Sequence, residues 1–174
     1  MDLSKNELSI HSVPVLEDNI IWIWTIGNDA VVVDPAISES IADWLKNRKL
    51  SLKAILQTHH HKDHIGGTPG LLKHWPSAEV IASKDDLERI PFQTISVKEG
   101  DKIKIMGEII NILEVPAHTK NHIAFFINNE KVQDKIPVLF CGDTLFAAGC
   151  GRLFEGSPKD MFNSLNKFKN LPPL

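Results

Sequence analysis

The sequence predicts a mixed α/β or α+β fold, and three observations support this class. Short apolar runs rich in β-branched and aromatic residues recur along the chain, as at 20–24. Segments with helical spacing of apolar residues, most clearly 38–48 and 158–169, separate several of these runs. The chain has 174 residues, 43% of them hydrophobic and 24% charged, which is enough for one domain with its own core. We therefore expect alternating strands and helices in a single domain over 1–174.

The expected elements follow from periodicity and from turn-forming residues. A hairpin turn at 27–29 joins two of the strands, and a polar turn is expected at 128–135. The expected strands are 8–16, 20–26, 30–33, 54–56, 79–82, 94–98, 102–106, 108–115, 123–127 and 138–141. The expected helices are 38–48, 68–75, a short turn at 84–89, and 158–169.

The two longer helices each have a start signal and an apolar stripe. Ser38 is a typical N-cap residue, and Pro158 fits the first turn of a helix. The stripes consist of Ile41, Trp44 and Leu45 in the first helix and of Met161, Phe162, Leu165 and Phe168 in the last.

Composition excludes several classes of protein. The net charge of −3 argues against a partner bound through nucleic-acid phosphates. No apolar run approaches the ~20 residues of a membrane span, and the first residues lack a hydrophobic signal region. The two cysteines, Cys141 and Cys150, fit a reducing compartment without a disulfide framework. We therefore expect a cytoplasmic protein.

The stretch 58–67 carries the strongest functional signal. His59, His61, Asp63 and His64 fall within six residues, after the apolar run 54–56 and before a glycine pair. Imidazole and carboxylate groups are the ligand types of zinc, iron and manganese. A regular helix or strand would spread these side chains over different faces. The pattern therefore predicts a metal-binding loop at the end of a buried strand.

This T-H-x-H-x-D-H pattern followed by glycine resembles the signature of the metallo-β-lactamase-fold hydrolases. The resemblance implies an αββα four-layer sandwich with a metal site at one edge.

Two further segments resemble elements of the same superfamily. Residues 116–122 match P-x-H-T-x-x-H, and residues 142–146 match G-D-T-L-F. Seen alone, His118 or Asp143 would be an ordinary loop residue. Three elements in the order of the superfamily support one another. The resemblance implies that a first metal takes His59, His61 and His118, that a second takes Asp63 and His64, and that Asp143 bridges them.

Some residues have competing interpretations. Asp34 ends an expected strand, so it is either a turn residue or a partner that orients a ligand histidine. His122 matches a position that is not usually a direct ligand, and His74 is expected at the surface. Cys141 and Cys150 lack the spacing of a zinc knuckle and are interpreted as neither ligands nor nucleophile.

The segment 148–157 indicates the class of substrate. It resembles the G-C-G-[RK]-x-[FY]-E-G-[ST] element of the glyoxalase II family, the hydroxyacylglutathione hydrolases, and 16–20 resembles that family's x-x-D-N-Y element with Ile20 in place of tyrosine. The resemblance implies that Arg152 and Phe154 contact glutathione. Phe154 lacks the hydroxyl of a tyrosine, and Arg152 has an alternative interpretation as a structural loop residue.

The resemblance implies an activity and its cofactors. The expected reaction is hydrolysis of S-(2-hydroxyacyl)glutathione, such as S-lactoylglutathione, by a hydroxide that bridges two divalent metal ions. Zinc is the first choice, and iron or manganese suit the same ligands. Asp143 would hold both ions, and Asp63 would orient the nucleophile or take its proton.

Two alternatives remain open at this stage. A glutathione persulfide dioxygenase with one iron shares the fold, but its C-G-R-x-x-F motif fits 148–157 less well. The second alternative is a remnant that binds metal without catalysis, because the sequence ends at Leu174, before the position of the family's last histidine ligand. We also expect the last strand and helix of the sandwich and the C-terminal helical substrate domain to be absent. An incomplete sandwich would lower occupancy of the second metal and favour self-association.

Overall fold

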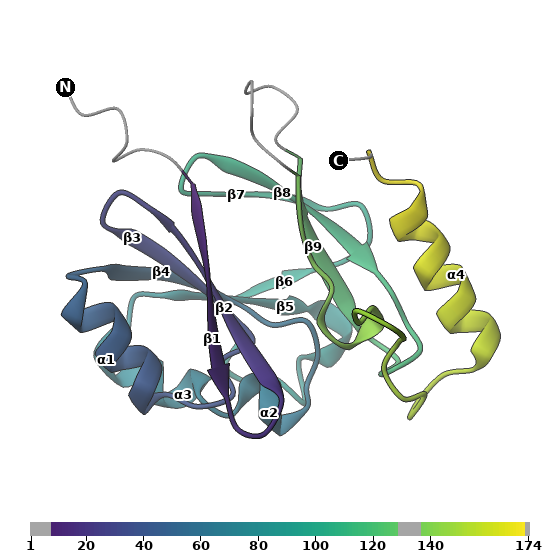
Figure 1. The fold of residues 1–174 in the computed structure, drawn as a ribbon, viewed down its shortest axis with the longest axis horizontal. Helices are drawn as coiled ribbons and strands as arrows, with labels where there is room; N and C mark the ends of the chain where they lie inside the picture. Colours follow the sequence, from purple (N-terminus) through teal and green to yellow (C-terminus); the bar gives the residue numbers. More distant parts are fainter. Residues whose placement is uncertain (1–7, 129–136, 173–174) are drawn as a thin grey trace.

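Two β-sheets form the centre of the molecule (Figure 1). The computed structural model describes residues 8–128 and 137–172. Most of the polar turn expected at 128–135 lies outside the described residues.

The first sheet has six strands in the order β1-β2-β3-β4-β5-β6. The strands β1, β2 and β3 pair antiparallel, whereas β3 to β6 pair parallel. Their bounds are Ser9–Val15, Asn19–Ile26, Asp29–Val33, Ser51–Leu56, Glu79–Ser83 and Ile95–Val97. The parallel arrangement brings the carboxyl ends of β3 and β4 to the same edge of the sheet.

The second sheet has four antiparallel strands in the order β10-β9-β8-β7. Their bounds are Lys102–Ile105 for β7, Glu108–Glu114 for β8, Ile123–Ile127 for β9 and Val138–Phe140 for β10.

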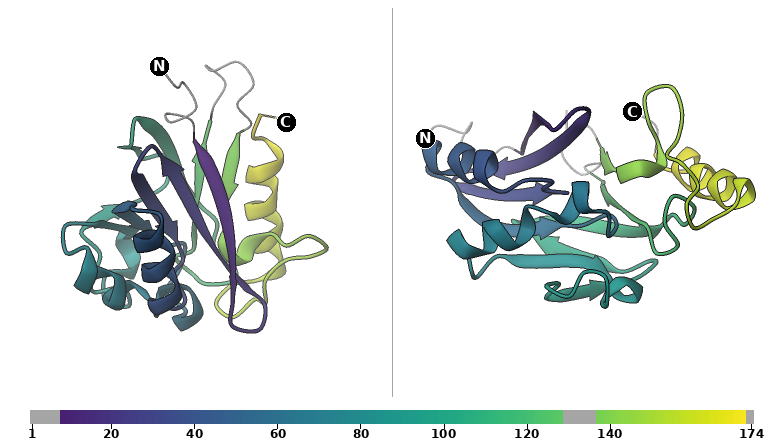
Figure 2. Two further views of the ribbon diagram at one scale, coloured as in Figure 1. Left: turned by 60° about the vertical axis from the view of Figure 1, so that its left-hand side comes forward. Right: turned by 90° about the horizontal axis from the view of Figure 1, so that it is seen from below.

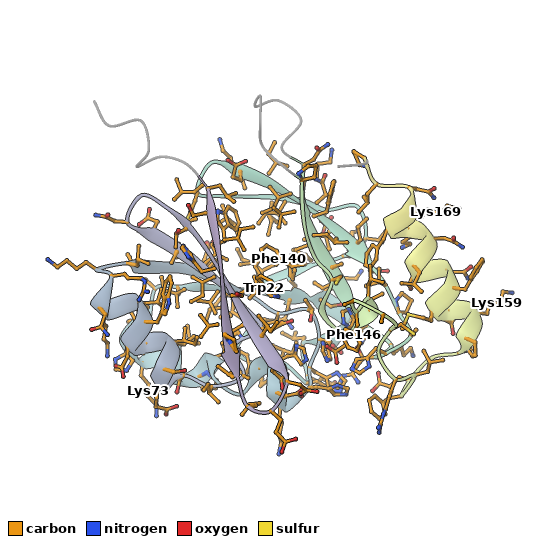
Figure 3. The ribbon with its side chains drawn as sticks, in the orientation of Figure 1. Trp22, Lys73, Phe140, Phe146, Lys159 and Lys169 are labelled. Carbon is orange, nitrogen blue, oxygen red and sulfur yellow. The ribbon has the colours of Figure 1, made fainter. Side chains whose placement is uncertain are left out.

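Helices cover the two outer sides. In the described part of the chain the helices are α1 (Glu39–Asn47), α2 (Lys62–Ile65), α3 (Thr68–His74) and α4 (Pro158–Lys169), and 3₁₀ turns lie at Lys84–Asp86 and Gly142–Thr144. Helices α1 and α3 lie on the side of the first sheet, and α4 lies at the opposite side of the molecule (Figure 2). Lys159 and Lys169 extend outward from α4 (Figure 3). This arrangement confirms the predicted αββα layers.

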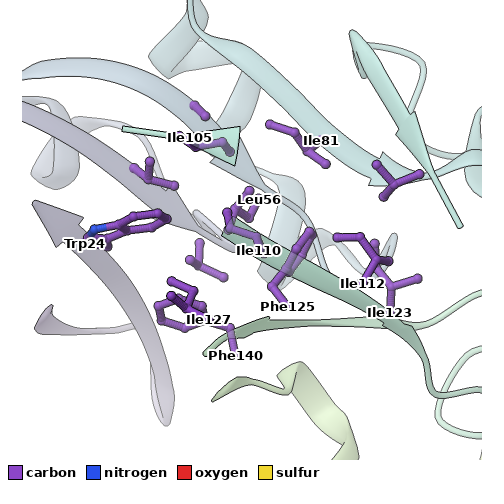
Figure 4. Close-up of a cluster of buried hydrophobic side chains, with 14 residues drawn as sticks. Trp24, Leu56, Ile81, Ile105, Ile110, Ile112, Ile123, Phe125, Ile127 and Phe140 are labelled. Atoms are coloured by element: carbon purple, nitrogen blue, oxygen red, sulfur yellow. The ribbon is translucent and has the colours of Figure 1, made fainter. Parts of the chain in front are cut away.

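The core has two parts, one on each face of the first sheet. Between the two sheets, Trp24 and Leu56 pack with Ile110 and Phe125 from the second sheet (Figure 4). On the other face, side chains of β2 to β5 pack against apolar residues of α1 and α3. The strands β3 and β4 are thus covered on both faces, which explains their continuous apolar sequence.

The expected elements form with a few differences. The metal loop is not entirely irregular, since Lys62–Ile65 make one helical turn closed by the Ile65 N–H to the His61 carbonyl at 3.0 Å. Ser38 is the N-cap of α1, but its side chain makes no capping hydrogen bond. Ser157 and Asp160 instead form a reciprocal capping box at the start of α4. Within the described residues, no helix is long and apolar enough to cross a membrane.

The packing predicts where truncation of a side chain costs most. Phe125 is fully buried between the sheets, so Phe125→Ala should lower the free energy of unfolding by about 3–5 kcal/mol in urea denaturation. Ile109 on β8 is 52% exposed, so Ile109→Ala serves as the control with a loss below about 1 kcal/mol. Equal losses for the two variants would contradict the two-sheet core.

Candidate metal centre

The candidate ligands lie on loops that follow strands of both sheets. Asp34 directly follows β3, and the stretch 57–61 follows β4. His118 lies between β8 and β9, and Asp143 lies in the turn after β10. Segments more than eighty residues apart in sequence therefore meet at one edge of the sandwich.

Asp34 holds the start of the metal loop. Its backbone has φ 50°, a left-handed conformation that aspartate tolerates better than most residues. One carboxylate oxygen accepts the Thr58 N–H at 2.8 Å, and the other accepts the Thr58 hydroxyl at 2.6 Å. The second oxygen also lies 3.0 Å from Nδ1 of His64. Asp34 thus has the position of a residue that orients a ligand, which is one of the two interpretations made from sequence.

Three histidine nitrogens converge at one point. Nδ1 of His61 lies 3.1 Å from Nε2 of His59 and 3.0 Å from Nε2 of His118. His59 and His118 are buried, and His61 is half-buried. A neutral imidazole has one nitrogen with a lone pair, and three such lone pairs facing one another repel unless a cation or a proton lies between them.

Asp143 lies between the two groups of candidate ligands. One carboxylate oxygen is 3.2 Å from Nε2 of His64, and the other is 3.3 Å from Nε2 of His118. The backbone N–H of Asp143 donates to Nε2 of His122 at 3.2 Å. His122 therefore uses this nitrogen to hold Asp143, which agrees with its expected position outside the ligand set.

Gly142 allows the turn that carries Asp143 to lie close to Thr58 and His122. Gly142 has φ 48°, and a Cβ atom there would lie 2.4 Å from the Thr58 hydroxyl and 2.8 Å from the His122 ring. Any larger residue would push Asp143 away from the histidines.

Asp63 completes the group from its more exposed side. Its carboxylate lies 3.6 Å from Nε2 of His64. The side-chain amide of Asn19, at the start of β2, donates to the same carboxylate at 3.1 Å. The sequence did not predict this contact, although Asn19 belongs to the segment 16–20 that resembles a motif of the glyoxalase II family.

The surroundings give the histidines different pKa values. Burial lowers the pKa of His64, but the hydrogen bonds that its ring donates to Asp143 and Asp34 outweigh this effect and raise the pKa to about 10. Burial holds the pKa of His59 well below its usual value, and the positive charge of neighbouring protonated histidines would lower this pKa further. Burial lowers the pKa of His122 to about 3, so its ring is neutral at pH 7.

These donors fit a divalent metal ion. The ligand atoms of His59, His61 and His118 all lie within 4.8 Å of one another. His64 adds a second observation, because its buried Nε2 faces the carboxylates of Asp143 and Asp63, at 3.2 and 3.6 Å. Neutral imidazole nitrogens beside carboxylate oxygens are suitable ligands for zinc, iron and manganese alike.

Two predicted substrate residues lie beside this centre. The Phe154 ring is 60% exposed and makes edge contacts with the rings of His61 and His118, at centroid distances of 5.5 and 5.3 Å. Arg152 is exposed, and its carbonyl oxygen accepts from Nδ1 of His118 at 2.7 Å. The backbone of this segment therefore contacts a candidate ligand, while its side chains remain accessible.

The other candidates lie apart from the centre. His74 is exposed at the end of α3, as expected. Both cysteines are free, and burial raises the pKa of the Cys141 thiol. The His60 ring makes an edge contact with His61, at a centroid distance of 4.9 Å, and its nitrogens face a charged network around Arg89 that sequence reasoning missed.

Most of the chain matches the model of a known protein family. Residues 13–174 match the model of the metallo-beta-lactamase superfamily. The chain belongs to the metallo-beta-lactamase superfamily. A curated relative named hydroxyacylglutathione hydrolase, from Synechococcus sp. (strain CC9605), is 58% identical over 164 residues. This match covers 94% of the chain and 66% of the relative, and it confirms the predicted resemblance to the glyoxalase II family.

Solved structures give the same fold. A B3 metallo-beta-lactamase named BLEG-1 superposes with a TM-score of 0.82 at 22% identity, covering 94% of this chain and 87% of that one. A protein named TTHA1623, solved in a di-iron-bound form, has a TM-score of 0.74 at 27% identity, with the same two coverages. The chain spans about two thirds of the length of the curated relatives that it matches.

The raised pKa of His64 predicts a pH-dependent metal affinity. Below pH 10 the metal-free ring carries a proton that a metal ion must displace, so the apparent affinity should rise between pH 7 and pH 9. Asp34→Asn removes one of the two carboxylates that retain this proton, so its pH dependence should be shallower. Isothermal titration with zinc at pH 7, 8 and 9 measures both proteins. An affinity that does not change with pH would contradict this pKa.

Proposed function

We propose that this chain hydrolyses S-(2-hydroxyacyl)glutathione thioesters at a centre of two divalent metal ions, most suitably zinc. The position of Asp143, with one oxygen toward His118 and the other toward His64, is the observation on which the proposal depends. A carboxylate in that place can contact two ions at once. The names of the curated relatives and the di-iron form of one solved structure support the same reaction and the same number of ions.

Each ion has its own set of residues in this proposal. His59, His61 and His118 would hold the first ion, and Asp63 with His64 would hold the second. Bound divalent cations would polarise the thioester carbonyl and lower the pKa of a water molecule toward neutrality. Such a centre needs no serine or cysteine nucleophile, which agrees with the half-buried Cys141 thiol, whose pKa is raised by burial.

The remaining groups of the chain orient the reactants. Asp34 fixes the ring of His64, and the Arg152 carbonyl fixes the ring of His118. Asp63 lies at the exposed edge of the centre, where its carboxylate can take a proton from the attacking water. Water adds to the carbonyl carbon, the C–S bond breaks, and glutathione leaves as a thiolate, since a free thiol has a pKa of only ~8.5.

Arg152 and Phe154 would bind the glutathione part. The Phe154 ring borders the ligands His61 and His118, so it offers apolar surface next to the reacting carbonyl. The exposed Arg152 guanidinium can pair with a glutathione carboxylate.

Loss of a ligand should remove metal and activity together. His59→Ala and Asp143→Asn should each reduce hydrolysis of S-lactoylglutathione by more than about 100-fold, because they remove the electrostatic stabilisation of the developing oxyanion. The metal content of each purified variant, measured by elemental analysis, should fall with the activity. His74→Ala is the control, since His74 is exposed on α3 and makes no contact with the cluster.

Full thioesterase activity in His59→Ala or Asp143→Asn would refute the proposed centre. Oxygen consumption with glutathione persulfide, together with one bound iron, would favour the dioxygenase alternative.

Removal of the Arg152 side chain should weaken substrate binding without preventing the reaction. Loss of one charge-assisted contact corresponds to a rise in KM of about tenfold for Arg152→Ala, with kcat changed much less. Steady-state kinetics with S-lactoylglutathione measure both constants. Lys169→Ala at the end of α4 is the control for a general effect of lost positive charge. An unchanged KM in Arg152→Ala would favour the structural interpretation of this residue.

A further inference from the structure

A charged network lies next to the metal centre and takes no part in the proposed reaction. Arg89 donates from Nε to Asp86 at 2.7 Å and from Nη1 to Glu155 at 2.7 Å. The Asp86 side chain is fully buried, and Arg89 also forms an ion pair with it through Nη2. Burial of a carboxylate is costly unless a cation and hydrogen bonds compensate, so Asp86 holds the guanidinium in one place.

Arg89 thereby joins segments that are far apart in the sequence. Its Nη1 lies 3.3 Å from Nε2 of His60, within the metal loop. The Asn121 amide donates to Asp86 at 2.8 Å, which adds the loop that carries His118. Through Glu155, the same arginine reaches the segment 150–157.

Glu155 connects this segment to the loop of His118. One of its carboxylate oxygens accepts from Arg89, and the other accepts the backbone N–H of Lys120 at 2.6 Å. Both oxygens are therefore occupied by donors, and each donor belongs to a different segment. A glutamine at this position could accept from only one of them and would turn its own N–H donors toward the other.

The segment 150–157 in turn holds the His118 ring. The Phe154 N–H donates to the His118 carbonyl at 3.2 Å, and the Arg152 carbonyl lies 2.7 Å from Nδ1 of His118. Since a carbonyl can only accept, Nδ1 carries the proton and Nε2 keeps its lone pair, directed at His61 and Asp143. The packing is close, because a Cβ atom on Gly151 would lie 2.0 Å from the Asp143 carbonyl and 2.9 Å from Nδ1 of His118.

We propose that Glu155 and Arg89 are positioning residues which, through the segment 150–157, fix the ring orientation and tautomer of His118 for metal binding. The glutamate ties the segment to the backbone of Lys120, the arginine ties the glutamate to the buried Asp86, and the segment presents the Arg152 carbonyl to His118. This inference rests on the metal centre of the proposed function and does not depend on which substrate is hydrolysed.

Cobalt(II) binding to the purified chain tests the proposal, since the visible spectrum of this ion reports ligand geometry. Glu155→Gln should bind cobalt(II) about 10- to 100-fold more weakly than the wild type, and its spectrum should change. Glu99→Gln is the matched control, because Glu99 also accepts a backbone N–H and forms an ion pair, with Lys167 at 2.9 Å. Glu99 contacts no candidate ligand, so its affinity should change by less than about threefold.

Thermal unfolding of each variant separates positioning from stability. Wild-type cobalt(II) affinity and spectrum in a folded Glu155→Gln would overturn the proposal, even if the melting temperature falls. If Glu155→Gln shows no cooperative unfolding, Arg89→Lys decides, because lysine keeps the charge but cannot reach Asp86 and Glu155 together. A weaker and spectrally altered site in Arg89→Lys supports the proposal, and an unaltered site overturns it.

Discussion

The hydrogen bonds of the buried Asp34 carboxylate are the interactions on which the geometry of the candidate metal centre depends. The carboxylate accepts two hydrogen bonds from Thr58, so the chain turns sharply as soon as β4 ends. The same carboxylate faces His64, which lies in the helical turn α2 of the same loop. A charged group that is only 7% exposed needs such partners, because its burial would otherwise cost several kcal/mol. The hydrogen bonds that compensate the burial of Asp34 therefore also position His64 and Thr58, the residue before His59.

The two sheets bring the rest of the centre to this loop. Parallel pairing of β3 with β4 puts Asp34 and the histidine loop at one edge of the first sheet. Antiparallel pairing of β9 with β8 and β10 brings the His118 loop and the Asp143 turn to the matching edge of the second. Hydrogen bonds then join the edges directly, as between the Ile123 N–H and the Thr58 carbonyl at 2.9 Å. The apolar core between the sheets thus determines the spacing of the candidate ligands as well as the stability of the fold.

Much of this was predictable from sequence because the informative residues are local. The strands follow from short apolar runs, and His59, His61, Asp63 and His64 lie within a single loop. The motifs around His118 and Asp143 indicated their positions through resemblance to a family. Whether all six residues bind metal stays a prediction, although the structure brings them together.

The contacts that sequence reasoning missed are long-range and involve common residue types. Asn19 and Asp63 are 44 residues apart, and Arg89 and Glu155 are 66 residues apart. Neither pair has a periodicity or a spacing that marks it, since each depends on how the loops pack at the edge of the sandwich. The helical turn of α2 was also missed, because the usual argument from helical periodicity applies to several turns and not to one.

Anomalous X-ray scattering from crystals of the metal-loaded chain tests the central claim most directly, because it locates the ions without reference to activity. The account predicts one peak among His59, His61 and His118, and a second beside Asp63 and His64, with Asp143 between the two. A single peak at the first position would leave the bridging role of Asp143 without support. Peaks elsewhere, or none at this edge of the sandwich, would contradict the metal centre itself.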